Sequence, residues 1–459
     1  MLIRRAVAIA IALTLFAAAA AEDPSLAAGP PIAGDYVPGE VLLIERPDTP
    51  AQAAAASVPG AIEVERAPSL RLRRLKLPPT VSVAEAVQRF SALRWVETAE
   101  PNYRTHADVI PADSLYGFQA WYYNLVQAPA AWDLETGDPG VVVAVIDSGI
   151  DLTHPDLNDN LWGNSLELAG QAGIDDDGNT IVDDRRGASF ISSPSSGCAG
   201  PAAGNPDDDS GHGTQVAGVL GAETNSPASG VAGTAWDVSL MTVKALDCNS
   251  LGTVSDAAQA VSYAAAQGAD ILNLSISLAI PRNGSGVCLA PAEPSTLAFA
   301  IEQAQQTYGV TIFAAAGNDG CPYVAYPAAT EEVIAVGASN GSAAPNAKAS
   351  FANWGTAMDL AAPGIDICST GWSQASGAGY LCGLDGTSFA TPMAAGLAAL
   401  MLAQDPALTF DQIRTVLETT AVNLPDSGAP NWDGRGRINM RAAVEAVSFQ
   451  ARLPGLARD

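Results

Sequence analysis

Short apolar runs alternate with helical patterns through the larger, C-terminal part of the chain. Continuous apolar segments predict buried strands, and longer segments with apolar residues every three or four positions predict helices. The expected strands are 141–146, 238–245, 270–277, 310–316 and 333–336, and the expected helices are 253–267, 295–308, 388–403 and 410–421. Apolar strands separated by helices indicate a parallel sheet that is covered on both faces. We therefore expect an α/β domain of three layers with a mostly parallel sheet.

A smaller pattern precedes this domain. Segments 37–44 and 69–77 predict strands, and 83–93 has the apolar spacing of a helix. Residues 22–106 therefore predict a separate small α+β unit. The residues alone leave open whether this unit is a binding module or a propeptide.

The N-terminus has the layout of a secretory signal peptide. Arg4 and Arg5 precede an apolar stretch that ends at Phe16, and small residues follow as far as Ala21. A membrane anchor is the alternative, but the apolar run is shorter than the roughly 20 residues that a spanning helix needs. We expect a signal peptide over residues 1–21, no attachment to a membrane, and export to the extracellular space or the periplasm.

The charge of the chain is uneven. Its 22 Lys and Arg residues against 49 Asp and Glu residues give a net charge of −27. Residues 107–459 carry 11 basic and 38 acidic side chains, so the whole imbalance lies in the larger domain. This argues against nucleic acid as a partner, because a phosphate backbone requires a basic face. It also predicts that neutral or cationic substrates are favoured over acidic ones.

Six cysteines lie beyond the expected signal peptide. An even number in an exported chain favours disulfides, and no C-x-x-C spacing points to a zinc or redox site. Cys368 and Cys382 are the best candidate pair, because a short hairpin through the Gly- and Ser-rich stretch between them would join them. The other pairings stay open.

Four polar residues stand where the apolar pattern ends or a helix begins. Asp147 follows the run 141–146, Asn318 follows 310–316, His212 lies between two glycines, and Ser388 starts the helix 388–403. Each has an ordinary alternative as a turn or helix-capping residue. Together they have the composition of a nucleophilic site, because a serine hydroxyl attacks only with a base beside it and a third group that orients the base.

The segments around these residues resemble the subtilisin-like serine proteases, the subtilases. The matching segments are Asp147-Ser148-Gly149-Ile150, His212-Gly213-Thr214, Ala315-Ala316-Gly317-Asn318 and Gly386-Thr387-Ser388. Their order of acid, histidine and serine is that of subtilisin. The resemblance runs from about residue 115 to 447 and implies a subtilisin-like peptidase domain over residues 107–459.

The resemblance also implies a mechanism and a zymogen. Ser388 would be the nucleophile, His212 the base and Asp147 the residue that orients it. Asn318 and the Ser388 backbone N–H would stabilise the oxyanion. Residues 22–106 would be a propeptide that assists folding and then inhibits, removed by self-processing within residues 104–114.

The expected substrate pocket has small and apolar walls. The resemblance assigns these walls to Leu274, Ser275, Ile276, Ser277, Ala315, Ala316 and Gly317. Ser277 stands where the family usually has Gly, which puts the shape of the pocket in question. Without an acid in these walls, we expect broad specificity with a preference for apolar residues.

An acidic loop predicts a calcium site. Residues 175–184 place carboxylates at alternate positions, as in the opening of a calcium-binding loop. The candidate ligands are Asp175, Asp177, Asn179, the Ile181 carbonyl and Asp184. A solvated acidic loop is the alternative. We expect structural Ca²⁺ and no cofactor in catalysis.

Two other functions compete with an active protease. One is an inactive homologue that serves as a binding or structural protein, and the other is a peptide ligase or cyclase on the same fold. The intact motifs favour a monomeric endopeptidase whose partners are polypeptide substrates and its own propeptide.

Overall fold

The computed structural model describes residues 36–47, 49, 58–104, 109–198, 204–224, 230–372, 379–425 and 429–451. The expected signal peptide, residues 1–21, lies outside the described residues, as do residues 105–108 of the expected processing region. The chain divides into two compact units, Met1–His106 and Ala107–Asp459.

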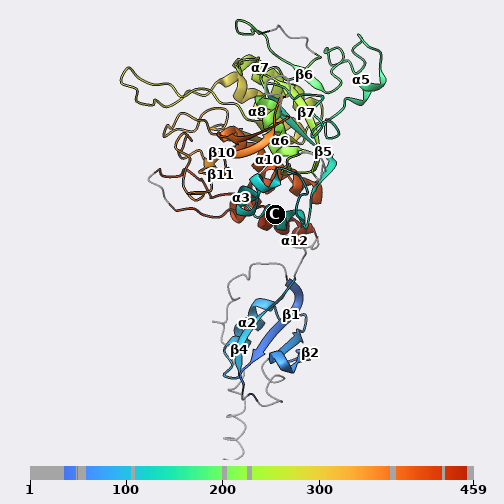
Figure 1. Cartoon of the computed structure of the whole chain (residues 1–459), viewed down its shortest axis with the longest axis vertical. Coiled ribbons are helices and arrows are strands. Elements are labelled where there is room, and N and C mark those ends of the chain that lie inside the picture. Colours follow the sequence, from blue (N-terminus) through green and yellow to red (C-terminus); the bar gives the residue numbers. More distant parts are fainter. Residues whose placement is uncertain are drawn as a thin grey trace, which may run out of the picture. The chain divides into compact units, whose positions relative to one another are not determined.

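In its described residues, the smaller unit is an antiparallel sheet with helix α2 against it (Figure 1). The strands lie in the order β2-β3-β1-β4, and the elements are β1 (Tyr36–Glu45), β2 (Ile62–Ala67), β3 (Leu72–Lys76), α2 (Val83–Ser91) and β4 (Val96–Tyr103). Helix α2 begins at the side-chain cap Ser82 and buries Phe90 in the core with Val41 and Leu43. The α+β expectation is confirmed.

Two details of the smaller unit differ from the sequence pattern. Strand β3 starts only at Leu72, because Pro68–Leu70 form a 3-10 turn whose end, Arg71, has φ +54°. Strand β2 was not predicted. Its apolar side chains Ile62 and Val64 are exposed, so no buried face marks it as a strand.

The larger unit is built on a seven-stranded sheet. The strand order is β11-β10-β9-β8-β5-β7-β6, and every neighbouring pair is parallel. The strands are β5 (Gly137–Asp147), β6 (Gly187–Ser189), β7 (Asp237–Lys244), β8 (Ile271–Leu274), β9 (Thr311–Ala315), β10 (Ile334–Ser339) and β11 (Leu360–Pro363). The predicted parallel sheet is confirmed, although β8 ends three residues earlier than the apolar pattern suggests.

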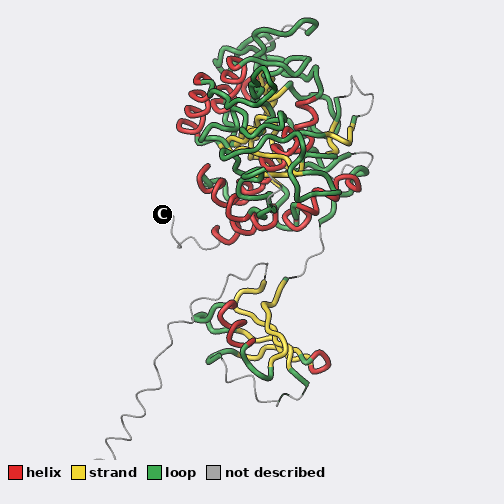
Figure 2. The backbone as a smooth tube through the Cα atoms, turned by 90° about the vertical axis from the view of Figure 1, so that its left-hand side faces the viewer, coloured by secondary structure: helices red, strands yellow, loops and turns green. Residues whose placement is uncertain are grey.

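Helices cover both faces of this sheet, so the domain has three layers (Figure 2). One face packs against α3 (Tyr116–Leu125), α4 (Ala128–Trp132), α6 (His212–Gly221), α10 (Thr387–Gln404), α11 (Phe410–Thr420) and α12 (Met440–Ala451). The other packs against α7 (Val254–Ala266) and α8 (Ser295–Tyr308). A short helix, α5 (Ser165–Ala169), lies in the loop after β5.

Helix α10 is the centre of one layer. Every residue from Thr387 to Leu402 is buried, and the helix crosses β5, β8, β9, β10 and β11. Its small residues allow close approach, since a Cβ on Gly396 would lie 2.7 Å from the side chain of Thr234. A helix that is apolar on all sides fits only inside a domain. The sheet and its neighbours therefore fix the start of α10, where Ser388 lies.

All six cysteines are paired. The bonds are Cys198–Cys248, Cys288–Cys321 and Cys368–Cys382. The predicted pair Cys368–Cys382 is confirmed, and it joins the antiparallel strands β12 (Ile367–Thr370) and β13 (Tyr380–Leu384). Within the described ranges, none of the helices has both the length and the apolar character that crossing a bilayer requires.

Candidate active site

Asp147 and His212 are in contact at the carboxyl end of strand β5. Asp147 is the last residue of the interior strand β5 and is fully buried, and His212 is the first residue of α6. Asp147 Oδ1 lies 2.7 Å from His212 Nδ1. Because a carboxylate only accepts hydrogen bonds, Nδ1–H is the donor, and Nε2 is left as the basic nitrogen.

Close backbone packing makes this contact geometrically feasible. A Cβ on Gly213 would lie 2.0 Å from the carbonyl oxygen of Gly149, so only glycine lets the start of α6 approach the end of β5. The glycine that follows His212 in the sequence is therefore required by the geometry of the pair.

The surroundings of His212 favour its protonated form. Burial lowers the pKa of His212, but the charge of Asp147 and its hydrogen bond to the ring raise it, and the charge of Asp208 adds to the rise. The pKa of His212 therefore lies above its ordinary value of 6.5. The neutral, proton-accepting form is populated only at correspondingly higher pH.

Ser388 lies at the second position of α10, where the helix presents free N–H groups and the positive end of its dipole. The residue is 8% exposed, and its hydroxyl donates to the carbonyl of Ser275 over 3.2 Å. The neighbouring Phe389 ring lies 5.9 Å from the His212 ring, centroid to centroid. No hydrogen bond joins Ser388 to His212 in the described part of the chain, so the hydroxyl must turn from Ser275 before it can donate to Nε2.

Asn318 lies on the loop after β9, and its amide orientation is defined. The backbone N–H of Thr387 donates to Asn318 Oδ1 over 3.0 Å, and the Thr387 hydroxyl donates to the same oxygen over 2.9 Å. Because a backbone N–H can only donate, the atom that faces it must be the amide oxygen. Asn318 Nδ2 therefore faces away from Thr387 as an exposed donor beside the start of α10.

The expected pocket walls lie side by side. Leu278 N–H donates to the carbonyl of Tyr326 over 2.8 Å, and Ala325 N–H donates to the carbonyl of Ala316 over 2.9 Å. These bonds connect the segments that contain the predicted wall residues. Along the first segment Leu274 and Ser275 are buried, Ile276 is half-buried and Ser277 is exposed, and in the second Ala315, Ala316 and Gly317 are buried.

The residue after β8 is connected to the start of α10. The Ser275 hydroxyl donates to the backbone carbonyl of Ser388 over 2.8 Å, and Asn273 Nδ2 donates to the Ser275 hydroxyl over 3.0 Å. The end of β8 is therefore hydrogen-bonded to the helix that carries Ser388.

Three carboxylates converge in the acidic loop. One oxygen each of Glu167, Asp175 and Asp177 lies within 4.8 Å of the others, and Glu167 is fully buried in α5. The sequence pattern did not indicate Glu167, because this residue precedes the acidic run. This all-oxygen set has the chemistry that a hard cation such as Ca²⁺ requires.

The other predicted ligands surround this cluster. Asn179 Nδ2 donates to Asp177 and to Asp184 over 2.8 Å each, and Asn179 Oδ1 accepts from Ile181 N–H. Asp184 is buried and accepts from the Tyr263 hydroxyl over 2.6 Å. The structure therefore brings Asp175 and Asp177 together with Glu167, while Asn179, Ile181 and Asp184 are joined to them through hydrogen bonds.

His154 is buried and hydrogen-bonded at both ring nitrogens. It is 1% exposed, its Nδ1 accepts from the backbone N–H of Asp156, and its Nε2 lies 2.6 Å from the carbonyl of Gly379. Nε2–H therefore donates to that carbonyl, and both ring nitrogens are engaged. The adjacent Asp156 is buried, and burial first, with the charges of Asp113 and Glu223, raises its pKa to about 7.

Comparison with known proteins gives matches over both units. Residues 138–436 match the model of the subtilase family, and residues 22–102 match that of the fervidolysin N-terminal prodomain. A thermophilic serine proteinase of Bacillus sp. (strain AK1) is 36% identical over 90% of the chain and 88% of its own length. Subtilisin Savinase of Lederbergia lenta is 36% identical over 71% of the chain and 98% of its own length.

A solved structure agrees with these matches. A protease from Pseudoalteromonas arctica PAMC 21717 superposes with a TM-score of 0.57 at 27% sequence identity. The superposition covers 74% of this chain and 100% of that chain.

Proposed function

The chain belongs to the subtilase family and is a serine endopeptidase with an N-terminal prodomain, and from this premise we propose that Asp147, His212 and Ser388 form its catalytic triad. The observation that carries the proposal is the 2.7 Å contact between Asp147 Oδ1 and His212 Nδ1 at the start of α6. It fixes the imidazole tautomer and leaves Nε2 as the base for the nucleophile.

The reaction follows the acyl-enzyme route. His212 Nε2 accepts the proton of the Ser388 hydroxyl while Oγ bonds to the carbonyl carbon of the substrate. The protonated imidazole then gives that proton to the leaving amine as the C–N bond breaks. Water, deprotonated by the same nitrogen, hydrolyses the ester and restores Ser388.

The negative charge of the tetrahedral intermediate requires preorganised donors. Asn318 Nδ2 and the Ser388 backbone N–H supply them. The two hydrogen bonds from Thr387 support this role of Asn318, because they hold the amide with its nitrogen exposed before substrate arrives. The positive end of the α10 dipole acts in the same direction.

The chain is made as a secreted zymogen. Residues 1–21 are the signal peptide, 22–106 the inhibitory propeptide and 107–459 the peptidase domain. A folding template has a physical reason, because a parallel sheet has many non-local contacts and forms slowly. Substrates are polypeptides cut with broad specificity and an apolar preference, which the small and apolar segments around Ile276 and Ala316 support.

Calcium stabilises the acidic loop. Glu167, Asp175 and Asp177 would hold the ion, and Asn179 would keep Asp177 in place through the hydrogen bonds that it donates to Asp177 and Asp184. When bound, the cation neutralises the mutual repulsion of the carboxylates. It takes no part in the chemistry at Ser388.

Expression of the Ser388→Ala variant tests self-processing, and product analysis tests the reaction. Wild type is expected to release the propeptide and to give hydrolysed fragments of an unstructured polypeptide, whereas the variant stays full-length and inactive. Trimming of the purified variant by itself would refute self-processing. Joined peptides in the mass spectrum would favour a ligase, and no reaction of the wild type would favour an inactive homologue.

A further inference from the structure

One buried asparagine uses every hydrogen-bonding position of its side chain. Asn353, on the segment between β10 and β11, is fully buried. Its Oδ1 accepts from the backbone N–H groups of Asp319 and Cys321 over 3.0 Å each. Its Nδ2 donates to the carbonyl of Ala316 over 3.1 Å and to the Asp319 carboxylate over 3.2 Å.

These contacts lie on both sides of Asn318. Ala316 precedes Asn318 by two residues, and Asp319 follows it directly. The backbone of Asn353 adds a fifth bond, from its N–H to the carbonyl of Gly317 over 3.0 Å. Asn353 therefore contributes five hydrogen bonds to the loop from Ala316 to Cys321.

Gly317 shows how closely Asn353 approaches this loop. Gly317 has φ +100°, and a Cβ at this position would lie 2.4 Å from Asn353 Nδ2. Position 317 thus has neither the space nor the backbone conformation for a side chain. Asn353 bonds to the backbone on both sides of Asn318, whereas Thr387 fixes the orientation of its amide and accepts from the N–H of Gly317 over 3.3 Å.

We propose that Asn353 is a positioning residue for the oxyanion donor Asn318. The proposal rests on the function assigned to Asn318 above. An oxyanion donor acts only when it lies within about 2.7–3.1 Å of the developing charge, and a displacement of about 1 Å can cost 10²-fold in rate. A residue that sets this position acts on the transition state and much less on substrate binding.

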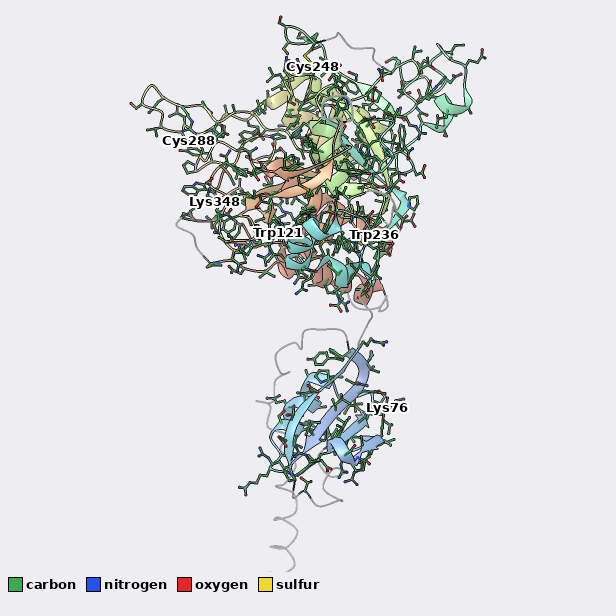
Figure 3. The ribbon with its side chains drawn as sticks, viewed as in Figure 1. Lys76, Trp121, Trp236, Cys248, Cys288 and Lys348 are labelled. Atoms are coloured by element: carbon green, nitrogen blue, oxygen red, sulfur yellow. A yellow bond between two sulfur atoms is a disulfide. The ribbon has the colours of Figure 1, made fainter. Side chains whose placement is uncertain are left out.

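Two further contacts hold the same loop and reach it only after Asn318. Cys321 is bonded to Cys288, which lies on an arm that extends from the larger unit (Figure 3). Arg282 Nη2 donates to the carbonyl of Asp319 over 2.5 Å. These contacts leave the residues before Asn318 untouched, whereas Asn353 bonds to both flanks.

The test is a double-mutant cycle between Asn353→Ala and Asn318→Ala, with kcat and KM measured on one peptide substrate. Alone, Asn353→Ala is expected to lower kcat about 10- to 100-fold and to change KM less than about twofold. In the Asn318→Ala background it is expected to lower kcat no further, because the donor that it positions is gone.

Controls separate positioning from a general loss of structure. Asn160 is a matched amide, since its Nδ2 donates to the carbonyls of Gly221 and Trp236. Asn160→Ala is expected to lower Tm and leave kcat unchanged. If Asn353→Ala does not fold, Asn353→Asp replaces it in the cycle, because it keeps the size of the side chain and both acceptor contacts.

The outcomes distinguish this proposal from the function on which it rests. Multiplicative losses of kcat in the double variant, an effect on KM alone, or an unchanged kcat in the Asn353 variant would overturn the positioning role. If Asn318→Ala itself leaves kcat unchanged, the oxyanion assignment fails.

Discussion

The Ser148 hydroxyl donates a hydrogen bond of 2.9 Å to the carboxylate of Asp208, which joins the residue after Asp147 to the loop before His212. Asp208 is 2% exposed. It also accepts hydrogen bonds from three backbone N–H groups, those of Ser210, Gly211 and Thr214. Asp208 thus holds the two elements of the Asp–His pair together and places a second negative charge near the imidazole.

The pH dependence of catalysis follows from these charges. Catalysis needs the neutral imidazole of His212, and the charges of Asp147 and Asp208 raise the pKa of His212 above 6.5. The acidic limb of the pH profile of kcat/KM should therefore lie above pH 6.5. In Asp208→Asn one of the charges is lost, so the limb should move to lower pH.

Asp207→Asn is the matched control for that profile. Asp207 lies in the same loop, but its carboxylate accepts from the backbone N–H of Leu152 and does not contribute to the raised pKa of His212. Its profile should follow the wild type. A limb that moves upward in Asp208→Asn, or equally in both variants, would contradict the electrostatic account.

Calcium should stabilise the protein through Glu167 and its two partners. A ligand that binds only the folded state adds about 2.7 kcal/mol at 100 times its Kd, which corresponds to a rise in Tm of roughly 3–4 °C for a unit the size of Ala107–Asp459. Glu167→Gln should reduce the difference in Tm between calcium and chelator. Differential scanning calorimetry in the Ser388→Ala background measures it without self-digestion.

Asp176→Asn serves as the control for the calcium cluster. Asp176 lies in the same loop and accepts from the N–H of Gln171, but it is outside the three-carboxylate cluster. The calcium-dependent rise in Tm should persist in this variant. An equal rise in wild type and Glu167→Gln would remove the cluster as a calcium site.

Removal of the Cys288–Cys321 disulfide should lower the free energy of unfolding and leave kcat nearly unchanged. The bond spans 33 residues, so the chain-entropy model gives about 3.5 kcal/mol of unfolding free energy. Denaturant unfolding of Cys288→Ser/Cys321→Ser, again with Ser388→Ala, measures this loss. In the active background kcat should change little, because the contacts of Asn353 Nδ2 with Ala316 and Asp319 do not depend on the disulfide.

Cys368→Ser/Cys382→Ser gives the comparison for a shorter loop. This bond spans 14 residues, and the same model gives about 3 kcal/mol. If removal of Cys288–Cys321 lowers kcat strongly and leaves the free energy of unfolding unchanged, then this disulfide, and not Asn353, positions the loop that carries Asn318.

The sequence predicted the parallel sheet because its strands are short and apolar on both faces. The run 141–146 lies within β5, and 295–308 is α8 with the same bounds. The contact between Asp147 and His212 also agrees with the sequence motifs, since Asp147 follows a buried strand and His212 begins a helix. These features depend on local residues, which a sequence displays directly.

Long-range relationships were harder to foresee. Glu167 joins Asp175 only because a short helix folds back onto the acidic loop, and nothing near Glu167 in the sequence marks this. Asn353 lies 35 residues after Asn318, and its side chain contacts that loop only in the folded chain. The sequence contains one weak indication of this contact. Gly317, directly before Asn318, has no side chain and lets another residue pack closely, but the sequence does not show which residue that is.

Covalent labelling tests the central claim that Ser388 is activated by His212. Purified mature protein would be treated with a fluorophosphonate, digested, and examined by mass spectrometry beside the His212→Ala and Ser388→Ala variants. We expect one adduct, on Ser388, in the wild type and none in either variant. An adduct on another residue, or an unlabelled Ser388 in the folded wild type, would contradict the account.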